Sequence, residues 1–165
     1  MQIHGLLQTF PTHIKLFIGA FVIVLSVGYI SGLLFVRQTN SDTPNGIEEN
    51  YLGNEKIEDA RIMKFEKGER EMLTIVHTHI LSMSFIFFLL GGLVSMTTLS
   101  TKVKTFLMVE PFISILLTFG GIYLMWKGML WMKYVVMISG TVMSGVFITA
   151  ALAVLIQLAK SNKTN

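Results

Sequence analysis

The chain has no cysteine among its 165 residues, and only 14% of its residues are charged. The absence of cysteine excludes disulfide bonds, thiolate metal sites, iron–sulfur clusters and haem attached through cysteine. The scarcity of charge excludes an ordinary soluble domain, in which about 25% of residues are charged. The net charge of +3 comes from scattered lysines without a basic stripe, so nucleic acid is not an expected partner.

The chain also lacks the motifs of common enzyme classes. It contains no Walker loop, no His-Glu-x-x-His and no Gly-x-Ser-x-Gly, and no carboxylates are paired at hydrolase spacing. An enzyme is therefore the least expected class, and the sequence assigns no catalytic residue.

Apolar residues are abundant instead, at 52% of the chain. A helix that crosses a bilayer needs about 20 mostly apolar residues. Four stretches meet this requirement, at about residues 14–36, 72–98, 105–126 and 132–159. Because short connections join the last three, the pattern predicts an all-α, integral membrane four-helix up-down bundle, with 1–165 forming a single transmembrane domain.

Residues 37–71 form a polar extramembrane segment that holds every acidic residue except Glu110. The stretch 43–46 (TPNG) predicts a turn near its start. Residues 57–67 fit either a short helix on the membrane surface or a solvated loop.

The basic residues predict an orientation in the cell (inner) membrane. The lysines near the two termini and in the 100–104 connection fit the cytoplasmic side. Lys127 and Lys133 count against this assignment. We expect both termini inside and residues 37–71 outside.

Small and polar residues predict the helix contacts, because helices in lipid associate through close packing and hydrogen bonds. The first helix has Gly28-x-x-x-Gly32, and the third has Ser114 and Thr118 at helical spacing. The tyrosines fit anchoring at the membrane surface. Besides the lipid bilayer, the expected partner is another membrane protein or a second copy of the chain.

The most informative stretch is Val76-His77-Thr78-His79-Ile80-Leu81 in the second helix. Residues two apart on a helix point in nearly opposite directions, so the two imidazoles cannot chelate one metal ion. The stripe of small and polar residues predicts that His77 faces the bundle interior. His79 lies on the side of Met72 and Met83.

The local motif VHTHIL resembles the His-x-His helix of haem–copper oxidases. That resemblance implies that His77 and His79 are haem ligands on opposite faces of one helix. The copper-ligating histidines and the other haem-ligand helix of that family have no counterpart here, so the chain is not such an oxidase. More widely, GIEENYLGNE, MKF and HTHILSMSFIFFLLGGL resemble small four-helix bacterial membrane proteins of unassigned function, which implies no activity.

The histidine pair leaves several interpretations open. The two side chains could bind haem b, a soft metal such as copper with Met83, or a proton, or they could only form hydrogen bonds to neighbouring helices. A haem held by two histidines needs a second one at the same depth, and His4 and His13 are expected at the opposite membrane face. The second ligand would then be Met125, Met129 or Met132, or a histidine from another chain, or the second position would stay empty.

Glu110 is the one carboxylate beside a span after the polar segment. Because Pro111 follows it, a helix start is predicted here, with Glu110 interacting favourably with the helix dipole. The alternative is a proton or cation site.

Two functions follow from these patterns. The first is a small haem- or metal-binding subunit for electron transfer or a respiratory complex. The second is a non-catalytic structural or accessory subunit without a cofactor. A transporter or channel is less expected, because the sequence has few buried charges and no matching pair of broken helices.

Overall fold

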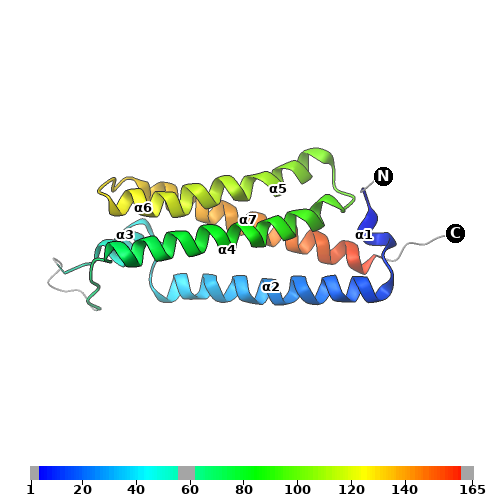
Figure 1. The fold of residues 1–165 in the computed structure, drawn as a ribbon, viewed down its shortest axis with the longest axis horizontal. Coiled ribbons are helices and arrows are strands. Elements are labelled where there is room, and N and C mark those ends of the chain that lie inside the picture. Colours follow the sequence, from blue (N-terminus) through cyan, green and yellow to red (C-terminus); the bar gives the residue numbers. More distant parts are fainter. Residues whose placement is uncertain (1–3, 56–61, 161–165) are drawn as a thin grey trace.

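The computed structural model describes residues 4–55 and 62–160, and in these residues it contains helices and no strands. Four helical runs are long and apolar enough to cross a membrane. They are α2 (Thr12–Gln38), α4 (Glu69–Ser95), the continuous run Thr101–Trp126, and α7 (Met132–Ala159). The four runs lie side by side along one axis (Figure 1). The predicted all-α membrane bundle is therefore confirmed.

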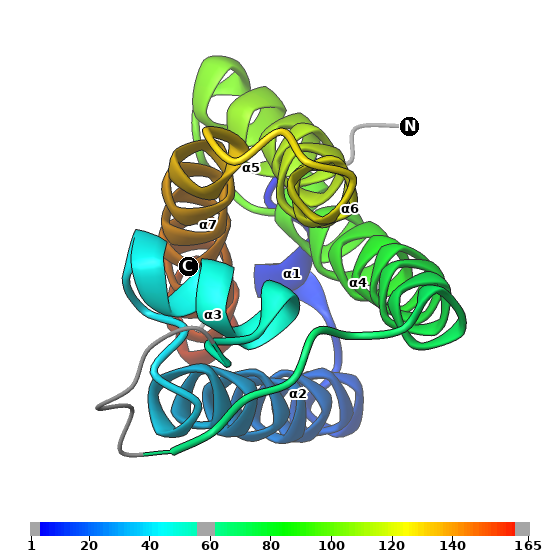
Figure 2. The same ribbon diagram turned by 90° about the vertical axis from the view of Figure 1, so that its left-hand side faces the viewer.

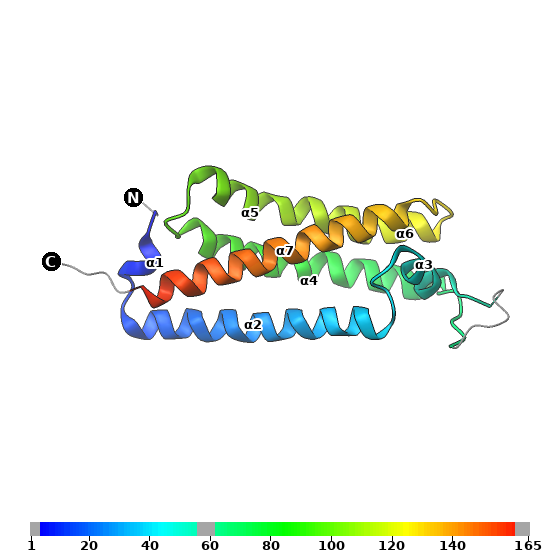
Figure 3. The ribbon, with the colours of Figure 1, turned by 180° about the vertical axis from the view of Figure 1, so that it is seen from behind.

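One end of the bundle, here called the terminal end, gathers both chain termini and the α4–α5 connection (Figure 3). The short helix α1 (Leu6–Thr9) caps this end, and its Leu7 is fully buried. The Gly5 amide donates a hydrogen bond to the Thr97 carbonyl at 3.2 Å. Lys15 Nζ donates to the Lys160 carbonyl at 3.2 Å, which joins the first and last spanning helices.

The opposite end, here called the loop end, carries the polar segment and the α6–α7 turn. The stretch 43–46 is not a free turn, because Thr43 is the N-cap of helix α3 (Pro44–Leu52) and accepts a hydrogen bond from the Gly46 amide at 3.1 Å. A threonine cap followed by proline at the first helical position is a helix-start pattern. The predicted turn was therefore wrong.

The polar segment packs against the end of the bundle. Lys133 forms an ion pair with Glu48 at 2.7 Å, and Trp126 Nε1 donates to the Lys67 carbonyl at 2.9 Å. Tyr51 of α3 is largely buried, and this burial raises the pKa of its hydroxyl above the usual value of 10.0. Residues 57–67 were predicted to form either a short surface helix or a solvated loop. Residues 62–67 are not helical, and 57–61 lie outside the described residues.

The third spanning run consists of α5 (Thr101–Ile115), the π-helical turn η1 (Leu116–Gly120) and α6 (Gly121–Trp126). Pro111 lies inside α5, so the predicted helix start at Glu110-Pro111 was wrong. Proline is tolerated within helices in lipid, because nearby groups and local π adjustments satisfy the freed backbone carbonyls. A π-helical turn, of a kind frequent at functional sites, follows five residues later.

Figure 2 shows α2 along one side of the bundle. The four spanning runs contribute unequally to the core. In their most apolar stretches, 44% of residues are buried in Thr101–Trp126 and in α7, against 11% in α4 and 6% in α2. Gly121 packs closely on Val136 of α7. By contrast, Gly28 and Gly32 have no neighbour within 4 Å of an added Cβ, so this predicted contact face is open in the described chain.

Candidate functional site

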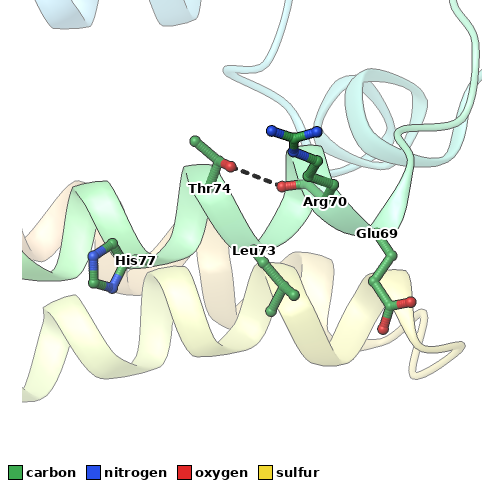
Figure 4. Close-up of a pocket in the computed structure, with 5 residues that line it drawn as sticks. All are labelled: Glu69, Arg70, Leu73, Thr74 and His77. Carbon is green, nitrogen blue, oxygen red and sulfur yellow. Dashed lines mark hydrogen bonds between the residues drawn. The ribbon is translucent and has the colours of Figure 1, made fainter.

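His77 lies on the outer surface of α4, where it lines an open hollow together with Glu69, Arg70, Leu73 and Thr74 (Figure 4). Its side chain is exposed, so the prediction that it faces the bundle interior was wrong. The charged residues of the hollow lie toward its loop end, with Glu69 3.6 Å from Lys127 Nζ.

His79 lies on the side of α4 that meets the third run. Its ring stacks on Phe119 of η1, with centroids 4.8 Å apart and planes 28° from parallel. Its Nδ1 lies 2.7 Å from the Ile75 carbonyl oxygen. Because a carbonyl can only accept, Nδ1 is the donor of this hydrogen bond, and a neutral imidazole would then have its lone pair on Nε2. The imidazole is therefore held by one ring nitrogen, and the side chain is exposed, like that of His77.

Met72 and Met83, which share the side of His79, are fully and partly buried respectively. His79 and Met83 are four residues apart and thus neighbours on one helix face. At a rise of 1.5 Å per residue, His77 and His79 lie about 12 and 15 Å from the first residue of α4. His4 and His13 lie at the terminal end, away from both.

Within residues 4–55 and 62–160, no group of three or more His, Cys, Asp or Glu side chains is arranged to hold a metal ion. A haem has a smaller requirement, because the porphyrin supplies the equatorial nitrogens and the protein supplies only axial ligands.

A second group of side chains, here called the central cluster, lies in the middle of the bundle and was not predicted. Tyr29 of α2 stacks on Phe147 of α7 with centroids 3.9 Å apart, and its edge meets Phe87 of α4. The Tyr29 hydroxyl lies 3.2 Å from Ser144 Oγ. Surface anchoring was therefore the wrong interpretation for Tyr29, which is deep in its helix.

Glu110 adds a carboxyl group to the central cluster. Ser114 Oγ donates a hydrogen bond to Glu110 Oε1, and Glu110 Oε2 is buried without a hydrogen-bond partner in the described chain. Glu110 is about 14 Å from the first residue of α5 at 1.5 Å per residue. The favoured dipole role is therefore wrong, because the dipole acts only within the first turn.

One signal could have revealed this cluster. Glu110 and Ser114 are four residues apart, the spacing at which side chains meet on a helix. The proline between them drew attention to a helix boundary instead.

Comparison with protein families matches residues 41–165 to Aq_1264_TM, which is described as a transmembrane helical domain. The matched residues include α3 to α7 and exclude α1 and α2. No curated protein and no solved structure matches the chain.

Proposed function

The chain belongs to the Aq_1264_TM family of transmembrane helical domains, and we propose that it is a small membrane subunit that gives His79 as one axial ligand to a haem shared with a second chain. The observation that carries this proposal is the hydrogen bond from His79 Nδ1 to the Ile75 carbonyl. A metal-bound histidine nearly always donates its other ring N–H to such an acceptor, which fixes the ring and raises its basicity.

The stack on Phe119 supports the same role, because it holds the imidazole in one orientation. Because the His79 side chain is exposed, a second chain can approach its Nε2. The second ligand would come from a symmetric copy of the chain. A haem in this position would serve electron transfer within the membrane.

The test is the reduced-minus-oxidised optical spectrum of the full chain, purified in mild detergent from haem-replete cells with a metal assay on the same sample. We expect a haem band that His79→Ala removes and that the matched variants His77→Ala and Met83→Leu retain. A colourless wild-type protein would overturn the proposal, and so would a band lost only with His77. A band replaced by bound copper would instead indicate a soft-metal site with Met83.

The second candidate is a non-catalytic accessory subunit without a cofactor. It is favoured by the exposure of α2, of which only 6% is buried in its most apolar stretch. A helix that packs so little within its own chain has most of its surface available to lipid or to a larger membrane complex. A colourless, metal-free protein would support this role.

We also propose that the terminal end faces the cytoplasm across the cell membrane. The segments at the terminal end contain lysines and no acidic residue. The segments at the loop end contain basic residues together with nearly all the acidic residues of the chain. The membrane potential acts on net charge and is negative inside. Lysine and arginine counted alone predict the opposite orientation, because the loop end contains more of them.

A further inference from the structure

We propose that Glu110 is a reversible proton-binding site in the interior of the membrane, and that it exchanges its proton with water at the terminal end. This inference is independent of the haem proposal. The two sites lie on different helices and at different depths, with Glu110 in α5 and His79 near the loop end of α4.

The first argument is the hydrogen bonding of the carboxyl group. One oxygen accepts from Ser114, and the other is buried without a partner in the described chain. A carboxylate has only acceptor sites and needs several donors, whereas a carboxylic acid needs fewer. An ionised carboxylate in the hydrocarbon region is costly unless it is paired. The carboxyl group of Glu110 thus lacks the donors that would satisfy an ionised carboxylate.

The second argument is the absence of a neutralising cation among the described residues. No ion pair includes Glu110. The facing part of α4 has no titratable residue between His79 and its end, and α7 has none between Tyr134 and Lys160. Between Lys15 and Arg37, the titratable residue of α2 is Tyr29.

The third argument is a route for the proton. A groove along α5 is lined by Thr101, Lys102, Thr105, Phe106 and Glu110, among others. Its polar groups lie at the terminal end, and its inner part is apolar. Lys102 is the one basic residue of this lining. Its positive charge at the terminal end of the groove would favour the carboxylate that remains when the proton leaves. Glu110 therefore lines the same open face of α5 as the polar residues at the terminal end.

The proposal can be tested with dicyclohexylcarbodiimide, which partitions into membranes and reacts with protonated carboxyl groups. The acid proton moves to a carbodiimide nitrogen, and the carboxylate oxygen bonds to the central carbon. The resulting O-acylisourea rearranges to a stable N-acylurea, so the whole reagent is added and nothing leaves. Peptide mapping by mass spectrometry would locate the adduct in the full chain in membranes.

We expect an adduct at Glu110 that declines as the pH rises. Glu110→Gln should lose it, and the matched variant Glu69→Gln, at an exposed glutamate of α4, should keep it. Mapping on the wild-type chain decides the result even if Glu110→Gln fails to fold. The proposal is overturned by the absence of an adduct at low pH, or by one that does not change with pH, as a permanently neutral packing residue would give. It is also overturned if Na⁺ at constant pH suppresses the adduct, which would indicate a cation site.

Discussion

At the scale of single residues, Tyr29 combines two kinds of contact with α7. Its ring stacks on Phe147 at an interplanar angle of 6°, and its hydroxyl lies 3.2 Å from Ser144 Oγ. Hydrogen bonds between membrane helices contribute about 0.6 kcal/mol on average. Removing a buried aromatic ring costs about 3–5 kcal/mol. The ring should therefore stabilise the fold more than the hydroxyl does.

We predict that Tyr29→Phe lowers the free energy of unfolding by less than about 1 kcal/mol, and that Tyr29→Ala lowers it by several times more. Unfolding of the detergent-solubilised chain, followed by circular dichroism, would measure both. Ile30→Ala is the matched control, because Ile30 is the next residue of α2 and is 51% exposed. Equal losses for Tyr29→Phe and Tyr29→Ala would contradict the importance of the stack.

The orientation of the histidines could not be predicted from polarity, for a physical reason. Serine and threonine side chains in these helices bond to carbonyls of their own helix. Thr74 Oγ1 donates to the Arg70 carbonyl at 2.8 Å, and Ser95 Oγ to the Gly92 carbonyl at 2.6 Å. A hydroxyl satisfied in this way can face lipid at little cost. The stripe that includes His77 was therefore no guide to the bundle interior.

At the scale of helices, the number and class of the spanning segments could be predicted, because length and hydropathy alone determine them. Their ends could not. Helix α4 begins at Glu69 and not near residue 72, because charged residues can continue a helix beyond the apolar span. Helix α5 continues through Pro111, where a rule derived from soluble helices predicted a start.

Helix α3 gives a testable case of docking outside the membrane. Glu48 of α3 pairs with Lys133 of α7 at 2.7 Å, and the two side chains are 30% and 16% exposed. Pairs this accessible contribute up to about 1 kcal/mol. We predict that Glu48→Gln speeds amide hydrogen exchange in residues 44–52 by up to about fivefold, since 1.4 kcal/mol corresponds to tenfold.

The control for this docking prediction is Glu55→Gln, at an exposed glutamate with no ion pair among the described contacts. Mass spectrometry of the exchanged peptides would compare the two variants with the wild-type chain. If α3 exchanges equally in all three proteins, the ion pair does not hold it.

At the scale of the whole molecule, the family match and the burial agree on a division of the chain. Residues 41–165 match the transmembrane helical domain, and the two most buried spanning runs lie within them. Helix α2 lies outside the matched residues and is the least buried. Its Tyr29 nevertheless stacks on Phe147 of α7 and meets Phe87 of α4. The least buried helix thus contributes an aromatic ring to contacts with two other spanning helices.

The orientation of the whole molecule can be measured directly, because the chain has no cysteine and single cysteines would be labelled without background. Asp42 at the loop end and Thr101 at the terminal end are both exposed. We predict that a membrane-impermeant maleimide labels Asp42→Cys in intact cells, and labels Thr101→Cys only after the membrane is opened. This orientation would put His79 nearer the outer surface and open the groove of Glu110 toward the cytoplasm. The reverse labelling would contradict the net-charge argument, and any proton exchange at Glu110 would then occur with the outer face.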